Sequence, residues 1–320
     1  MSTAKPKIYA LHENPDWFPP FARAFEQEGL EVEEWILTDG LLDLDSVPPE
    51  GIFWSRISAS AHTRDHGLSK DYARAVLSWL ESHGRRTVNG RRILELEMSK
   101  VDQLTALRAA GIDTPRSSAA VGRQHLLAAA RDFPTPFIVK HNQGGKGLGV
   151  RKFDSRAELA DYVASDEFEE SQDGITLIQE FVQAAEPVIT RVEIVGGEFI
   201  YAIAADTARG GFQLCPADSC AIDPTTGRPI MPPGATLAPE PDQQLFSLRE
   251  GFDHPIVEKY LKFARRMNLE ICGIEFIETK DGRILTYDVN TNTNYNAAVE
   301  AVAPRSAPLA LARYLKGLAG

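Results

Sequence analysis

Hydrophobic positions in the first 98 residues alternate between strand-like and helix-like spacing. Apolar residues at helical spacing predict helices at 18–28 and 70–82. Short apolar runs predict strands at 7–11, 30–37 and 51–55. This alternation predicts a small parallel sheet covered by helices. Ligands of such sheets bind at the carboxyl ends of the strands, so the loops 12–17 and 56–66 are the candidate binding loops.

The loop at 56–66 carries two arginines among hydroxyl and imidazole side chains. Arginine forks bind carboxylates and phosphates, so we predict that Arg56 and Arg64 bind a substrate carboxylate, with Ser58 and His62 beside them. A polar connection without a ligand is the alternative, because loops are polar by default.

Residues 87–111 read as a turn followed by helices, and residues 136–153 as two strands joined by a glycine-rich loop. The loop glycines are Gly144, Gly145, Gly147 and Gly149. Glycines let backbone N–H groups approach phosphate oxygens, and Lys140 and Lys146 add positive charge. We predict a hairpin flap over nucleotide phosphates; a flexible hairpin without a ligand is the alternative.

Residues 175–182 form an apolar run whose end, Gln179 to Val182, is a candidate adenine site. Phe181 and Val182 would lie beside the ring, while Glu180 or Glu186 would accept from amino or hydroxyl donors. The next two strands turn at Gly196-Gly197, and Arg191 on the first of them would face a phosphate.

Two further runs, 271–277 and 283–289, pair across a turn at Asp281-Gly282. Pairing brings Glu275, Asp288 and Asn290 to one face, and their hard oxygen atoms suit Mg²⁺, with Mn²⁺ as a substitute. A solvated acidic hairpin is the alternative. Between these regions, 207–253 shows no regular element and is expected to be a loop or lid beside the second substrate, and helices are expected at 254–268 and at the end of the chain.

Composition narrows the class of protein. The chain has 320 residues, a formal charge of −11, 43% hydrophobic residues and three cysteines. We therefore expect a cytoplasmic protein without disulfides that binds neither nucleic acid nor membranes; a homodimer is compatible with this composition.

These pieces, in this order, resemble the ATP-grasp ligases, above all the ribosomal-protein glutamate ligases and prokaryotic glutathione synthetases. The resemblance covers roughly 87–300 and includes Ser99-Lys100, the glycine hairpin, the IQEFV segment, RVEIVGGE, GIEF and DVN. It implies an α/β fold, α+β in parts, with two α+β subdomains that enclose ATP behind a parallel α/β domain. The expected boundaries are 1–98, 99–182 and 183–320.

The resemblance also implies roles for particular residues. Lys100 and Lys140 would contact ATP phosphates, Glu180 to Val182 the adenine, Glu186 the ribose, and the acidic hairpin Mg²⁺. Asp288 stands where relatives usually carry glutamate. Relatives often carry a second arginine near Asp206, a role that Arg209 would take beside Arg191 as a catalytic residue.

The implied activity is ATP-dependent ligation of a small-molecule carboxylate to an amine through an acyl phosphate, on an amino acid or a peptide-like substrate. Two alternatives stay open: a kinase that phosphorylates a small-molecule hydroxyl, and an ATP-binding regulatory protein without turnover.

Overall fold

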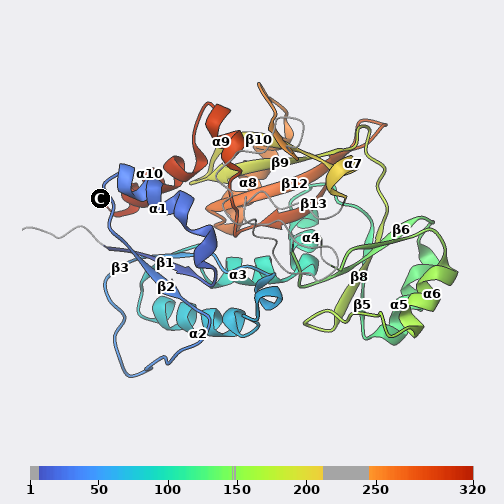
Figure 1. Cartoon of the computed structure of the whole chain (residues 1–320), viewed down its shortest axis with the longest axis horizontal. Coiled ribbons are helices and arrows are strands. Elements are labelled where there is room, and N and C mark those ends of the chain that lie inside the picture. Colours follow the sequence, from blue (N-terminus) through green and yellow to red (C-terminus); the bar gives the residue numbers. More distant parts are fainter. Residues whose placement is uncertain (1–6, 146, 148, 212–244, 320) are drawn as a thin grey trace, which may run out of the picture.

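The computed structural model describes residues 7–145, 147, 149–211 and 245–319. Its strands form three sheets, which Figure 1 shows as separate groups joined by helices. The first sheet has the order β2-β1-β3-β4 and is parallel throughout, as the alternating pattern predicted. Its strands are β1 (Lys7–His12), β2 (Val32–Ile36), β3 (Gly51–Ser55) and β4 (Arg86–Val88). The three-residue β4 lies in a segment that was expected to be a turn.

Helices cover both faces of this parallel sheet. Strand side chains alternate between the faces, so Ile8 and Trp54 pack with α1 (Pro19–Gln27), whereas Leu11 and Phe53 pack with α2 (Ser69–Ser82). The C-terminal helix α10 (Ala307–Ala319) joins α1 on the first face, where it contributes Leu311 and Leu315. The last helix of the chain therefore closes the core of the first sheet.

The second sheet has the order β5-β8-β6-β7 and is antiparallel. Its strands are β5 (Ser117–Val121), β6 (Phe137–His141), β7 (Arg151–Phe153) and β8 (Ile175–Glu180). Two α-helices accompany it, α5 (Leu126–Ala129) and α6 (Arg156–Ala164). The predicted hairpin of β6 and β7 is confirmed, and the glycine loop joins its two strands.

The third sheet has the order β11-β10-β9-β12-β13 and is also antiparallel. Its strands are β9 (Val188–Val195), β10 (Glu198–Asp206), β11 (Phe246–Leu248), β12 (Ile271–Glu278) and β13 (Ile284–Asn290). Along β9, Val192 and Ile194 face the helix α8 (Ile256–Met267), whereas Arg191 and Glu193 point to the other face. This alternation leaves one polar face, on which the candidate site is built.

The stretch 207–253 differs from the expectation that it has no regular element. It begins with the short helix α7 (Thr207–Gly210) and ends near β11, which pairs with β10. Cys215 and Cys220 lie outside the described residues, and Cys272 is buried. A further helix, α9 (Ala297–Val302), precedes α10.

Helices α3 (Arg91–Met98) and α4 (Lys100–Ala109) follow the first sheet in the chain and pack against β13 of the third sheet. The Gln103 side chain on α4 is fully buried and binds the outer edge of β13, the last strand of the third sheet. Its amide nitrogen donates to Val289 O at 2.9 Å, and its oxygen accepts from Val289 N at 3.1 Å. It also donates to Leu96 O. The Gln103 side chain thus makes hydrogen bonds to Val289 that a neighbouring strand would otherwise make. Because Lys100 is on the same helix, this contact also fixes Lys100 relative to the acidic hairpin.

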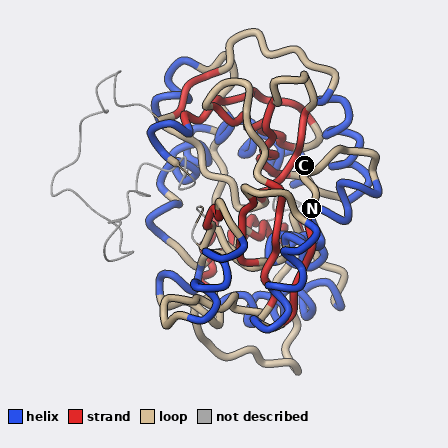
Figure 2. The backbone as a smooth tube through the Cα atoms, turned by 90° about the vertical axis from the view of Figure 1, so that its right-hand side faces the viewer, coloured by secondary structure: helices blue, strands red, loops and turns tan. Residues whose placement is uncertain are grey.

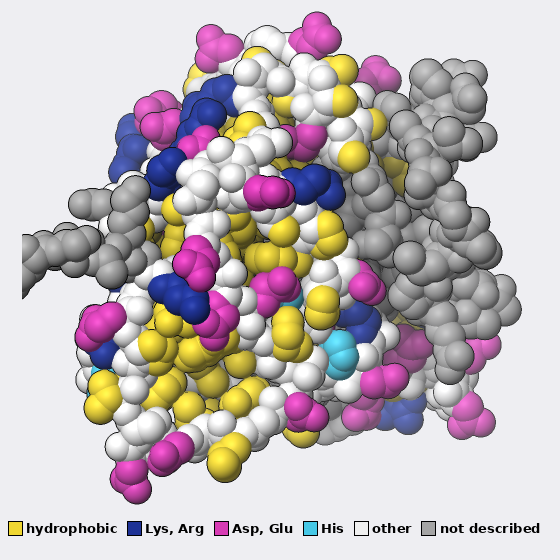
Figure 3. Space-filling view, turned by 60° about the vertical axis from the view of Figure 1, so that its left-hand side comes forward, with side chains coloured by type: hydrophobic (Ala, Val, Ile, Leu, Met, Phe, Trp, Pro, Cys, Tyr) yellow, Lys and Arg dark blue, Asp and Glu magenta, His cyan; other side chains and the backbone are white. Residues whose placement is uncertain are grey.

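Helices lie mainly around the outside of the strands, as the rotated view in Figure 2 shows. On the face in Figure 3, acidic and basic side chains are mixed with hydrophobic ones. Among the described residues, no helix is long and apolar enough to cross a bilayer.

Replacing Gln103 with methionine tests this edge contact. Methionine has a similar volume but leaves the Val289 backbone groups and Leu96 O unpaired, so the free energy of unfolding should fall by about 2–4 kcal/mol. Urea denaturation measures it. The exposed Gln124→Met is the matched control and should change stability by less than about 0.5 kcal/mol; equal values for both variants would contradict the role of Gln103.

Candidate active site

A cavity of about 730 Å³ lies between the glycine hairpin of the second sheet and the polar face of the third. It collects most of the residues that the sequence singled out, although they come from separate stretches of the chain. The predicted residues that line it are Ser58, Lys100, Lys140, Gly144, Gly145, Gly147, Glu180, Phe181, Val182, Glu186, Arg191, Glu275, Asp288 and Asn290. Lys146 lies outside the described residues. The volume is large enough for a nucleotide together with a second ligand.

The acidic hairpin places two carboxylates side by side on the cavity wall. Glu275 on β12 and Asp288 on β13 are register partners. Tyr287 Oη donates to one oxygen of Glu275 at 2.8 Å, and Asn290 Nδ2 donates to the other at 3.1 Å. Burial, and then the negative charge of Asp288, raises the pKa of the Glu275 carboxyl. A bound cation would relieve this unfavourable pairing.

The side-chain oxygen atoms of Glu275, Asp288 and Asn290 are of the kind that hard divalent cations bind. In the described part of the chain no three His, Cys, Asp or Glu side chains gather into a metal cluster. The predicted ligands remain Glu275, Asp288 and the Asn290 amide oxygen, all of which line the cavity. Mg²⁺ commonly completes such a small set with water and substrate phosphates.

Two lysines face this acidic hairpin. Lys100, at the start of α4, forms an ion pair with Asp288. Burial acts to lower the pKa of Lys100, but Asp288, Glu97 and Glu275 together outweigh burial and raise that pKa. Lys140, on β6, is only 6% exposed and has no carboxylate partner among the described residues; burial, and then the charge of Lys100, lowers its pKa to about 8. The cavity wall thus carries two lysines, of which Lys100 is paired with a carboxylate and Lys140, within the described residues, is not.

Arg191 is the centre of a buried ionic cluster on the polar face. Its Nε donates to Glu193 at 2.6 Å, and its Nη1 donates to Glu275 at 3.2 Å. Its Nη2 donates to Thr293 Oγ1 at 2.5 Å. The guanidinium lies directly over Gly273, where an added Cβ would come within 2.3 Å of Nε. Glycine at this position is therefore a condition for the cluster.

The segment from Glu180 to Pro187 crosses from β8 to β9 and lines the cavity along its whole length. Lys152 lies over the Phe181 ring, with Nζ at 5.3 Å from its centre. The Glu180 carboxylate accepts from Arg116 N at 2.7 Å, so part of it fixes the start of β5. The apolar side chains of this segment could contact a nucleobase, and its backbone groups could hydrogen-bond to the edge of that base.

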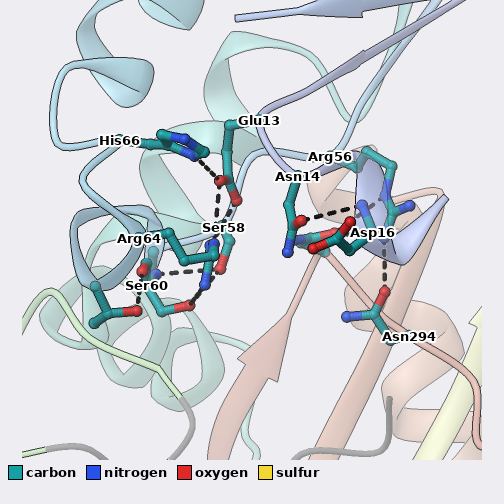
Figure 4. Close-up of polar contacts among 12 residues, drawn as sticks. Glu13, Asn14, Asp16, Arg56, Ser58, Ser60, Arg64, His66 and Asn294 are labelled. Atoms are coloured by element: carbon teal, nitrogen blue, oxygen red, sulfur yellow. Dashed lines mark hydrogen bonds and ion pairs between the residues drawn. The ribbon is translucent and has the colours of Figure 1, made fainter. Parts of the chain in front are cut away.

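The arginines of the N-terminal loop are placed differently from the expectation that they contact substrate. Arg56 is 2% exposed and is not part of the cavity wall. Its Nη2 donates to Asn292 at 3.0 Å and Asn294 at 2.8 Å, as Figure 4 shows for Asn294. Its guanidinium also lies 4.3 Å from the centre of the Phe21 ring. The side chain is satisfied within the protein and positions two asparagines that do line the cavity.

Arg64 is likewise held within the protein. Its Nη2 donates to the buried Glu13 at 2.6 Å and its Nη1 to Ser60 Oγ at 3.1 Å (Figure 4). His62 is half-buried and is not part of the cavity wall, whereas Ser58 lines the cavity and hydrogen-bonds to Ser60. The loop therefore presents serine hydroxyls, not arginine forks, to the cavity.

Arg209 also lies off the cavity wall. Its side chain is 55% exposed and lies 3.6 Å from the Asp206 carboxylate, whereas Thr207 and Gly211 on either side line the cavity. Many other residues of the cavity wall were not among the predicted site residues; they include Trp17, Ser60, Tyr287, Asn292 and Asn294. The polar run TNTN at 291–294, directly after the acidic strand β13, was the available signal for the asparagines.

Comparisons with known proteins agree with this geometry. No family model matches the chain. A curated protein of Xanthomonas euvesicatoria pv. vesicatoria, a probable alpha-L-glutamate ligase, is 26% identical over 253 residues, which is 77% of this chain and 73% of the relative. The resemblance to ATP-grasp ligases is confirmed, and it supports an enzyme that forms C–N bonds.

Two solved structures share the fold across nearly the whole chain. The ATP-grasp ligase PsnB, in complex with a minimal precursor, Mg and ADP, has a TM-score of 0.64 at 16% identity and covers 100% of this chain and 99% of its own. A RimK domain ATP-grasp protein of Sphaerobacter thermophilus has a TM-score of 0.65 at 15% identity, covering 97% and 98%. The chain therefore has the ATP-grasp fold, as predicted.

Substituting Gly273 with alanine tests the Arg191 cluster. The new Cβ would displace the guanidinium from Glu193 and Glu275, so the free energy of unfolding should fall by about 1–3 kcal/mol. Gly317→Ala in α10 is the matched control, because nothing lies within 4 Å of its added Cβ. That helical position should gain up to about 1 kcal/mol. Thermal unfolding of both variants measures the contrast, and stabilisation by both would contradict the packing argument.

Proposed function

We propose that the protein is an ATP-dependent carboxylate–amine ligase that works through an acyl phosphate. The observation that carries this proposal is one cavity in which Lys100 and Lys140 face the carboxylates of Glu275 and Asp288. The relative named as a glutamate ligase and the fold of PsnB, which was solved with Mg and ADP, support it. We also propose three domains, 1–98, 99–182 and 183–320; each of these ranges contains the strands of one sheet.

The nucleotide would bind across the two sheets. The segment Glu180–Val182 would hold the adenine, Glu186 would accept from the ribose, and Lys140 would meet the phosphates beneath the glycine hairpin. Bound Mg²⁺, or Mn²⁺ in its place, would neutralise charge on the phosphates. Glu275, Asp288 and Asn290 would hold it; as Asp288 turns to the cation, Lys100 becomes available to a phosphate oxygen.

The reaction would then proceed by attack of a carboxylate oxygen on the γ-phosphorus, with release of ADP. An amine would attack the resulting acyl phosphate, and phosphate would leave as the amide forms. Arg191 contributes fixed positive charge beside this step and holds Glu275 in place. Neutral donors and acceptors, including Ser58, Asn292 and Asn294, would orient the small-molecule acid and amine.

The assignment predicts that Asp288→Asn reduces ADP formation about a hundredfold or more, because it removes a cation ligand and the partner of Lys100. The assay supplies candidate acid and amine pairs and measures amine-dependent ADP release, with mass spectrometry of the product. The exposed Asp161→Asn on α6 is the control and should retain full activity.

The same assay separates the ligase from its two alternatives. A phosphorylated hydroxyl as a stable product, without an amide, would assign a kinase. Nucleotide binding without turnover on any acid and amine pair would favour a regulatory protein. An amide product that depends on Asp288 supports the ligase.

The pKa of Lys140 predicts a pH dependence of nucleotide binding. Because burial lowers this pKa to about 8, the cation is present below pH 8 and is lost as the pH rises. The dissociation constant for MgADP should therefore rise by about tenfold between pH 7 and pH 9. Isothermal titration calorimetry measures it. Lys140→Arg stays charged throughout and should give a flat profile; a similar slope in that variant would exclude Lys140 as the titrating group.

A further inference from the structure

A second groove, of about 550 Å³, shares no lining residue with the candidate active site. It lies where the first sheet meets the third, between β4, the start of α3, the β9–β10 turn, the end of α8 and Tyr314 of α10. Four arginines line it: Arg86, Arg91, Arg92 and Arg265. A cluster of this kind stands out in a chain with a net charge of −11.

The two carboxylates in this groove already have partners. Glu270 forms an ion pair with Arg86 and accepts from the Tyr314 hydroxyl. Glu81 accepts from Arg91 N at 2.9 Å and from Thr87 Oγ1 at 3.1 Å. Among the described residues, neither carboxylate forms an ion pair with the guanidinium group of Arg91, Arg92 or Arg265.

Those three guanidinium groups have little or no local compensation. In the described part of the chain, the Arg91 guanidinium has no hydrogen bond or ion pair. Arg92 donates only to the Met267 sulfur, a weak acceptor, at 3.4 Å. Arg265 lies 3.9 Å from Glu258, and both side chains are more than half exposed, so this pair is weak. The groove thus presents up to three arginine forks to solvent.

We propose that this groove binds a small anion that carries at least two phosphate or carboxylate groups. Arginine forks bind either group through paired N–H donors, and several of them in one concave site favour a multivalent ligand. The turn residues Gly196 and Gly197 have no side chains to fill the groove, and Gly196 packs against the Tyr314 ring. The site is independent of the proposed ligase reaction.

Calorimetric titration with two probes, inorganic pyrophosphate and citrate, tests the proposal in magnesium-free buffer. Arg91→Ala/Arg92→Ala should weaken binding by about tenfold or more, since it removes two exposed cations and no core volume. Lys100→Ala/Lys140→Ala removes the phosphate-binding lysines of the other cavity and should leave this binding unchanged. Arg305→Ala/Arg313→Ala makes the same change of charge at exposed positions outside the groove and should also leave it unchanged.

Each possible result either supports or contradicts the proposed anion site. Pyrophosphate binding that depends on Arg91 and Arg92 assigns a phosphate-bearing ligand, and citrate binding with the same dependence assigns a carboxylate-bearing one. Loss of binding in the lysine variant instead would place the anion in the candidate active site. Equal weakening in the Arg305/Arg313 control would reduce the effect to net charge. Failure of both probes to bind the unmodified protein would also overturn the proposal.

Discussion

The polar face of the third sheet depends on one buried cation held between two carboxylates. Arg191 is 5% exposed and Glu193 is 1% exposed, so neither charge is solvated by bulk water. An unpaired buried charge costs several kcal/mol, and the geometry here avoids it because each arm of the guanidinium has a fixed partner. The positive charge of Arg191 opposes the effects of burial and of Asp288, which raise the pKa of the Glu275 carboxyl.

The same cluster fixes the segment 291–294, which follows β13. Thr293 bonds to Arg191 and Glu193, and Thr291 bonds to the buried Glu97. Arg56 donates hydrogen bonds to Asn292, which lies between the two threonines, and to Asn294, which follows them. Alternate side chains are thus anchored to the third sheet, to α3 and to the first sheet. A shift of the first sheet would therefore move Asn292 and Asn294, which line the cavity, so the first sheet can change the shape of the cavity wall.

Local patterns in the sequence predicted the elements that have strong periodicity. Alternating residues in β9 and β12 and the glycine loop gave the hairpins, and the acidic residues on them converged as expected. The short strands β4, β5 and β11 were not predicted. β4 and β11 have only three residues each, and β5 consists mainly of small residues (SSAAV), so none of them shows a clear alternation of apolar and polar positions. The misplacement of Arg56 has another cause. Its sequence neighbourhood indicates a polar loop, whereas two of its hydrogen-bond partners, Asn292 and Asn294, lie more than 230 positions away in the chain.

The choice of arginine or lysine separates fixed cations from exchangeable ones in this cavity. Arg191 suits a permanent role because its planar fork binds several acceptors at once and stays charged when buried. Lys100 has one carboxylate partner, and Lys140 has no hydrogen bond among the described residues. A lysine ammonium group can turn from a carboxylate to another anion, because its single charge needs no paired hydrogen-bond geometry. The chain thus has an arginine where the polar face is held together by several fixed hydrogen bonds, and lysines where the cations facing the cavity have few or no fixed partners among the described residues.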